Sequence, residues 1–145
     1  MDGFVQIPNA LTTYYNYFPH FNGNTMQVYA YLKRMSNDAY GYAFPTEIQA
    51  MEDLVMSDST FSKHVKTLKK CGLVTVKKRK SGSFSNNVYF VHEPITSADE
   101  FFRVYPEADE VRRKKAETIA RIKKRKSDEA EALVEAQDDE LSGWL

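Results

Sequence analysis

The uneven distribution of aromatic residues is what most constrains the fold of this chain. Eleven of the 19 aromatic side chains fall between Phe4 and Phe44, and only Trp144 follows Tyr105. Because aromatic side chains carry much of the apolar surface that a core can bury, the core has to be built from the part of the chain that ends near Tyr105. The total of 145 residues corresponds to about one domain.

Two classes of protein are excluded early. No apolar run approaches the ~20 residues of a membrane-spanning helix, and the N-terminus lacks a basic-then-apolar signal segment. The single cysteine, Cys71, rules out an internal disulfide and suits a reducing compartment. We therefore expect a cytoplasmic protein, neither an integral membrane protein nor a disulfide-stapled secreted domain.

Charge is segregated along the chain, although 20 basic and 20 acidic residues cancel overall. Residues 61–92 carry eight basic and no acidic side chains, and residues 112–126 carry nine basic and one acidic. The remaining segments are acidic, with net charges of −4 over 1–60, −5 over 93–111 and −7 over 127–145. Positive charge concentrated on one element is typical of proteins that bind an anionic partner, most often nucleic acid.

Prolines and glycines in residues 1–23 predict an extended arm with about one turn of helix. Its many apolar side chains should pack on the domain or on a second subunit. Apolar residues then recur at helical spacing over about 25–36, where Asn24 caps the predicted helix. After loop-like residues 36–41, the capping box Thr46-Glu47-Ile48-Gln49 starts a second helix over about 46–53, with Ile48, Met51 and Leu54 facing inward.

A third helix is expected over 58–71, with Ser57 or Asp58 as its cap and Gly72 as its stop. One face is apolar and carries Phe61, Val65 and Leu68 at i, i+4 and i+7. The opposite face carries Ser59, Ser62, Lys63, Lys66 and Lys70. Residues 73–76 and 88–91 are β-rich and flank a turn at 81–83, which predicts a hairpin with a basic first strand.

Three helices followed by a basic hairpin form, in this order, a winged helix-turn-helix. We therefore expect a mainly α fold with a small antiparallel β-hairpin and a long charged C-terminal helix. The expected organisation is an aromatic arm over 1–23, a winged helix-turn-helix DNA-binding domain over 24–94, and a charged helical extension with an acidic tail over 95–145.

The third helix has the width that fits a DNA major groove, where short polar residues reach base edges and lysines contact phosphates. The wing at 77–87 would grip the backbone. The candidate DNA-binding residues are Ser57, Ser59, Thr60, Ser62, Lys63, Lys66 and Lys70 from the helix, and Lys77, Lys78, Arg79, Lys80, Ser83 and Asn86 from the wing. If about six to eight charges contact phosphates, the logarithm of affinity should fall with that of salt concentration at a slope of roughly −5 to −7.

Several short motifs add a family resemblance over residues 4–94. They are Phe4-x-x-Ile7-Pro8, Val28-Tyr29-Ala30-Tyr31-Leu32, Gly41-x-x-Phe44-Pro45-Thr46, Met56-Ser57-x-Ser59-Thr60, Leu68-x-x-Cys71-Gly72-Leu73-Val74 and Asn87-x-Tyr89. Together they resemble the winged-helix N-terminal domains of phage replisome organisers and plasmid replication proteins of low-GC Gram-positive bacteria. The resemblance implies a DNA-binding role in a phage or mobile element, in replication initiation or in transcriptional regulation, since regulators share this skeleton.

The chain departs from that family at three places. Val55 stands in the turn between the second and third helices, where glycine is usual, and Asp58 stands where a basic residue is usual. Asp58 either caps the helix or accepts a hydrogen bond from a cytosine amine. The family's separate helicase-loader-binding domain has no counterpart in this sequence.

The C-terminal segment starts with a capping box at 97–100 and continues, after Pro106, as a long helix over about 107–137. Its apolar stripe is thin, so it has no core of its own. Basic 112–126 followed by acidic 127–140 is self-complementary in an antiparallel pair, which suggests a homodimer. The alternatives are a basic helix on DNA with a competing acidic tail, and a solvated charged helix. Residues 138–145, acidic and then apolar, suit a docking motif for a protein partner.

Catalysis finds little support in the sequence. Phosphate-cradling glycine motifs are absent, and His20, His64 and His92 lack metal-ligand spacing. Cys71 is expected to be a packing residue rather than a nucleophile. We therefore expect no enzyme activity, no cofactor and no metal, and a chain that binds double-stranded DNA. The alternative from another class is a winged-helix adaptor that binds a protein and touches DNA weakly or not at all.

Overall fold

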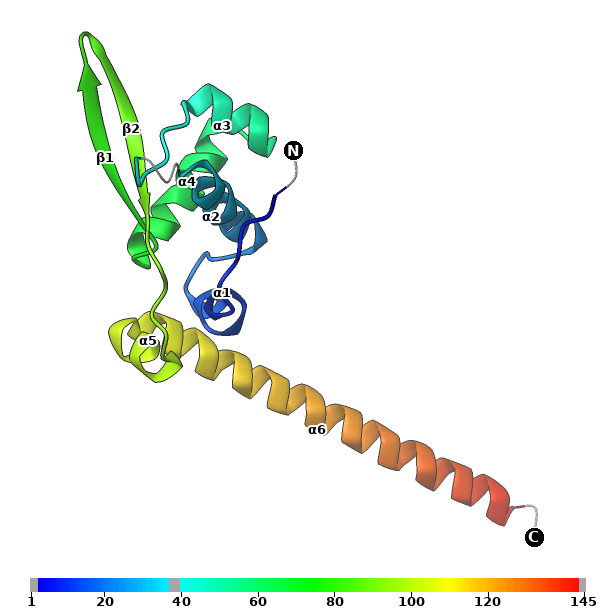
Figure 1. Cartoon of the computed structure of the whole chain (residues 1–145). Coiled ribbons are helices and arrows are strands. Elements are labelled where there is room, and N and C mark those ends of the chain that lie inside the picture. Colours follow the sequence, from blue (N-terminus) through cyan, green and yellow to red (C-terminus); the bar gives the residue numbers. More distant parts are fainter. Residues whose placement is uncertain (1–2, 37–39, 144–145) are drawn as a thin grey trace. The chain divides into compact units, whose positions relative to one another are not determined.

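The computed structural model describes residues 3–36 and 40–143 and divides the chain into two compact units, Met1–Asp109 and Glu110–Leu145. The elements are α1 (Ala10–Thr13), the 3-10 helix η1 (Tyr15–Tyr17), α2 (Gly23–Met35), α3 (Glu47–Leu54), α4 (Asp58–Lys70), β1 (Val74–Ser81), β2 (Phe84–Val91), α5 (Ala98–Val104) and α6 (Pro106–Ser142). In the first unit α2, α3 and α4 lie beside the two-stranded hairpin (Figure 1). The expected class, mainly α with a small antiparallel hairpin, is confirmed.

The N-terminal arm is part of the core of the first unit. After an extended start it forms α1 and η1, and it buries Leu11, Tyr14, Tyr15, Phe18 and Phe21. The ring of Tyr15 lies 4.4 Å from that of Phe101 in α5, centroid to centroid. The expectation that this arm packs on the domain is thus confirmed, except at Phe4, which is 88% exposed.

Helix α2 begins at Gly23, two residues before the start at about residue 25 that the sequence pattern predicts. Asn22, not Asn24, is the N-cap, and its side chain accepts hydrogen bonds from the backbone N–H groups of Asn24 and Thr25. The Thr25 hydroxyl accepts from the Asn22 backbone N–H, which completes a capping box. Thr25 is fully buried, so packing in the core holds the capping box in place.

Helix α3 has the predicted cap and part of the predicted inner face: Leu54 is buried as expected, Met51 is half-buried and Ile48 is not buried. The Thr46 hydroxyl accepts from the Gln49 backbone N–H, as expected. Ile48, expected to face inward, is 69% exposed. The buried residues are Ala50 and Leu54, one helical turn apart, because the small Ala50 side chain permits close approach to the neighbouring helices α2 and α4.

Helix α4 forms as predicted, with Ser57 as its cap. Phe61, Val65 and Leu68 are all buried. At the other end, Gly72 has a φ of +77°, and the Leu73 N–H donates to the Leu68 carbonyl, as in a Schellman stop. Only glycine fits there, since a Cβ would lie 2.9 Å from the Tyr105 hydroxyl.

The hairpin strands are longer than predicted. Pairing runs from Val74 with Val91 to Ser81 with Phe84, so β1 extends beyond the β-rich run 73–76 and includes the basic residues 77–80, as expected of a basic first strand. Ala43 exchanges two backbone hydrogen bonds with Tyr89 on the free edge of β2. Three helices with this hairpin complete a winged helix-turn-helix architecture.

The compact first unit extends further in both directions than residues 24–94. At its C-terminal end, Ser97 caps α5 by accepting from the Glu100 N–H, and Phe101 and Phe102 of α5 are buried. The first turn of α6 belongs to this unit too, with Ala108 fully buried. The two phenylalanines explain the extension, because they join the ring cluster of the N-terminal arm.

The second unit is the rest of α6, which continues to Ser142, past the predicted end near 137. Its described side chains are exposed except for Thr118, which is partly covered. Glu110 and Lys114 form one i,i+4 ion pair, with N–O at 3.1 Å. Among the described residues no helix is long and apolar enough to cross a membrane. Trp144 and Leu145, the end of the expected docking motif, lie outside the described residues.

The turn between α3 and α4 carries a strained residue. Val55 has φ and ψ of +52°, the left-handed conformation that glycine adopts easily and a β-branched residue does not. Its side chain is 88% exposed, so packing does not compensate. Val55 therefore holds, at a cost in strain, a turn conformation that glycine adopts easily.

We expect Val55→Gly to increase the free energy of unfolding by roughly 0.5–1 kcal/mol, since relief of the left-handed strain exceeds the added entropy of the unfolded glycine. Urea unfolding of both proteins measures the difference. Val55→Ala serves as the control and should gain less, because alanine keeps a Cβ. A less stable glycine variant would contradict the assignment of strain.

Candidate nucleic-acid interface

The outward face of α4 is a continuous basic and hydroxylated surface. Ser59, Lys63, Lys66 and Lys70 follow each other at helical spacing, opposite the buried Phe61, Val65 and Leu68, and all four are exposed. We call these four residues the outer stripe. After Asp58 the helix has no acidic residue. The apolar face thus fixes the helix on the core, and the outer stripe faces solvent.

The start of α4 is organised by hydroxyl groups. The Ser57 Oγ accepts from the Thr60 backbone N–H at 3.2 Å and donates to the Thr60 Oγ1 at 2.8 Å. The Ser59 Oγ lies 3.2 Å from the Ser57 Oγ. Ser57 and Thr60, both candidate base-contacting residues, are therefore engaged in the cap, whereas Ser59 starts the outer stripe.

A second row of α4 residues lines a groove shared with the hairpin. Ser62, Lys66 and Lys69 line a hollow of about 350 Å³ together with Val76, Asn87, Tyr89 and Glu47. Lys66 belongs both to this row and to the outer stripe. Lys69 was not among the candidates, although its spacing of three from Lys66 was visible in the sequence.

The basic run of the wing divides between two faces because it is strand. Side chains alternate along β1, so Lys78 shares a face with Val76, and Lys77 shares the other with Arg79. Lys78 lines a second hollow, of about 500 Å³, with residues 45–48, Asn86, Asn87 and Tyr89. The structure thus brings Lys78 and its cross-strand partner Asn87 to the face of Val76, whereas Asn86, which pairs with Arg79, reaches the hollow from the other face of the hairpin.

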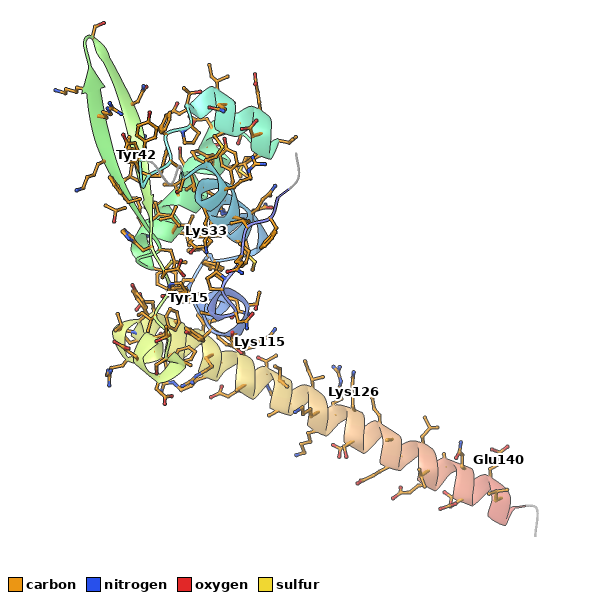
Figure 2. All side chains as sticks on the ribbon, in the orientation of Figure 1. Tyr15, Lys33, Tyr42, Lys115, Lys126 and Glu140 are labelled. Carbon is orange, nitrogen blue, oxygen red and sulfur yellow. The ribbon has the colours of Figure 1, made fainter. Side chains whose placement is uncertain are left out.

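Lys77 and Arg79 lie on the opposite face, against aromatic rings. The Arg79 Nη1 donates to the Tyr42 hydroxyl at 2.9 Å, beside the hairpin (Figure 2). The Lys77 Nζ lies 5.5 Å from the centre of the Phe90 ring, a cation–π distance. Tyr42 also contacts Tyr40, Phe44 and Phe90, with ring centroids 5.5–6.0 Å apart. Lys77 and Arg79 therefore already interact with aromatic side chains of the same chain.

Three of the candidate residues are exposed toward the far end of the hairpin. Gly82, with a φ of +63°, forms the turn together with Ser83. Lys80, Ser83 and Asn86 all expose their side chains to solvent. The three are free to follow a nucleic-acid backbone beyond the edge of α4.

Two carboxylates lie at the rim of the basic surface. Glu47, in the first turn of α3, lines both hollows, and Asp58 opens α4. Burial raises the pKa of the Tyr89 hydroxyl, which Asn87 lowers by a hydrogen bond and the charges of Glu47 and Asp58 raise again. The surface is thus basic at its centre and acidic at the α3 side.

A buried polar contact supports α4 from behind. The His64 Nδ1 lies 2.9 Å from the Thr25 Oγ1, and the two side chains are 3% and 0% exposed. Burial, and secondarily the charge of Lys63, lower the pKa of His64 below its ordinary 6.5. His64 is therefore neutral at neutral pH and joins α4 to the start of α2.

A metal site needs several ligating side chains close together. No three His, Cys, Asp or Glu side chains within residues 3–36 and 40–143 gather closely enough to hold a metal ion. Cys71 is buried, and burial raises the pKa of its thiol to about 12, as suits the packing role expected for it. Comparison of the chain with models of known protein families, with curated proteins and with solved structures gives no match.

We expect the free energy of unfolding to fall as the pH drops below about 6.5, because unfolded His64 then binds a proton that the folded side chain resists. One proton limits the slope to about 1.4 kcal/mol per pH unit. Urea unfolding between pH 5 and 7.5 measures it. In His64→Gln this part of the slope should vanish; an identical slope would show that other groups cause it.

Proposed function

We propose that this chain binds double-stranded DNA through its winged helix-turn-helix. The observation that carries the proposal is that α4 presents the outer stripe on a helix without acidic residues after Asp58, backed by a buried apolar face. Such a helix fits the major groove, about 12 Å wide. Of the candidate residues, Ser59 and Ser62 suit base edges, and Lys63, Lys66 and Lys70 suit phosphates.

The hairpin supplies the second contact of the proposal. Lys78, Asn86 and Asn87 line the hollow beside the start of α3, and Lys80 and Ser83 are exposed at the far end. These side chains can follow one strand of a duplex that α4 enters. Lys77 and Arg79 contribute less in this proposal, because the aromatic rings on the opposite face already engage them.

The biological context follows from the sequence resemblance alone. We propose a protein of a phage or mobile element that acts in replication initiation or in transcriptional regulation. Origins often present repeated sites in one direction, whereas dimeric regulators bind inverted repeats whose spacing matches the dimer. The arrangement of the bound sites therefore distinguishes the two roles.

A second candidate function is that of a winged-helix adaptor. It is favoured by the aromatic group beside the hairpin, in which Tyr40 is 58% and Phe44 is 51% exposed, with ring centroids 5.9 Å apart. Exposed aromatic residues are enriched where proteins bind proteins. In this alternative the lysines of α4 are solvated and DNA binding is weak.

Reversal of the charges at the centre of α4 tests the major-groove assignment. We expect Lys63→Glu with Lys66→Glu to weaken duplex binding on the order of a hundredfold, because two phosphate contacts become repulsive. Fluorescence anisotropy with a labelled duplex measures the loss, and circular dichroism checks that the variant folds. Unchanged affinity would rule out the assignment.

A matched control uses the other face of the hairpin. Lys77→Glu with Arg79→Glu changes the net charge by the same amount, from residues that contact Phe90 and Tyr42. A long-range effect of net charge would weaken binding equally in both double variants. The proposal expects a clearly smaller loss for the hairpin pair.

Selection of bound duplexes from a random pool, with the full chain near physiological salt, tests sequence recognition. We expect enrichment of a defined site, because Ser59 and Ser62 are placed at the start of an exposed helix. Inverted repeats would favour a regulator and direct repeats an initiator. Failure to enrich any sequence, together with weak binding, would favour the adaptor.

A further inference from the structure

The part of α6 in the second unit carries an apolar stripe with a regular period. Val111, Ile122 and Leu133 stand eleven residues apart, and so do Ile119, Ala130 and Leu141. An eleven-residue repeat equals about 3.67 residues per turn, so the stripe runs almost straight along an α-helix. Its large residues are between 38% and 64% exposed, and the described residues of the second unit do not cover them.

The same helix consists of a basic half followed by an acidic half. Residues 112–126 carry a net charge of +8 and residues 127–140 a net charge of −7. The sign changes directly after Lys126. Lys126 and Glu140, one from each half, project from the helix into solvent (Figure 2).

The apolar ladder and the charge division have the same centre. When a second α6 is laid antiparallel and centred on Lys126, Ile119 of one copy stands opposite Leu133 of the other, and Ile122 opposite Ala130. Val111 then stands opposite Leu141. The same alignment lays basic 112–126 along acidic 127–140. Nothing in the helical period requires this coincidence.

We propose that α6 pairs with the α6 of a second copy of this chain, antiparallel and centred on Lys126. Most individual charges agree with this register; the exceptions are Glu117, which stands at the height of Glu135, and Lys126, which stands at the height of its own copy. Arg121 stands at the height of Glu131, Lys123 at that of Glu129, and Lys124 at that of Asp128. Because the pair is two-fold symmetric, each match occurs twice.

Other occupants of the stripe fit less well. A parallel pair would set basic 112–126 against itself and acidic 127–140 against itself, and like charges repel. DNA would match the basic half, would be repelled by the acidic half, and would leave the apolar residues in water. A second copy in reverse satisfies both halves and covers the stripe.

Charge exchange in the full-length protein tests the pairing. Variant A carries Arg121→Glu, Lys123→Glu and Lys124→Glu, and variant B carries Asp128→Lys, Glu129→Lys and Glu131→Lys. Light scattering should give the native chain twice its 16.7 kDa and each variant about 16.7 kDa. An equimolar mixture of A and B, and a chain with all six changes, should both return to the double mass.

The outcomes separate the proposal from its competitors. A native chain at single mass, or variants A and B that both remain dimeric, would overturn the proposal. Failure of the mixture to dimerise would overturn the charge register. The masses are measured without DNA, so the test of pairing does not depend on whether the chain binds DNA.

Cysteine cross-linking tests direction and register. In the proposed pair Lys126→Cys forms a disulfide with its own copy under mild oxidation, because it lies on the two-fold axis. Ile119→Cys does not do so alone, but it forms one when mixed with Leu133→Cys. Efficient self-linking of Ile119→Cys would indicate a parallel pair and overturn the proposal. The native Cys71 is 1% exposed and gives little background.

Discussion

Burial of the apolar face of α4 is the contact on which the geometry of the candidate interface depends. Phe61, Val65 and Leu68 hold the helix against the core, and the Phe61 ring meets Tyr89 of β2 with centroids 6.1 Å apart. The helix therefore cannot rotate without losing apolar burial, which is worth about 1.5–3 kcal/mol for each large side chain. That constraint fixes both what faces solvent and where the hairpin lies beside it.

Local patterns predicted most of the helices, because amphipathic spacing and caps act over a few residues. The predictions failed where two residues of one helix are equally suitable by local pattern and packing in the core decides between them. Asn22 and Asn24 are equally good caps, and the buried Thr25, held by His64, selects the earlier one. Ile48 has the larger apolar side chain, yet Ala50 faces inward because the helices approach closely there. Neither choice is encoded within one helix.

The candidate site was predictable on α4 and less so on the hairpin. The period of 3.6 residues identified the outer stripe correctly as an exposed face. In the wing, the expected strands stopped at 76 and began again at 88, so the basic run was treated as one surface. Pairing to Ser81 imposes a period of two, which separates Lys78 from Lys77 and Arg79. The aromatic partner of Lys77, Phe90, lies in β2, whereas that of Arg79, Tyr42, comes from a loop far away in sequence and carries no local signal.

The two basic segments of the chain differ in their physical surroundings. Segment 61–92 is displayed on a surface fixed by a hydrophobic core, with acidic residues only at its rim, so its charge is available to an external anion. Segment 112–126 lies on a helix whose described side chains are almost all exposed, and the chain supplies a nearly equal opposite charge directly after it. A second antiparallel copy would neutralise both the basic and the acidic half and cover the apolar ladder, whereas DNA would neutralise only the basic half. The zero net charge of the chain therefore combines the +8 of segment 61–92 and the nearly balanced halves of residues 112–145 with the acidic segments 1–60 and 93–111, which carry −4 and −5.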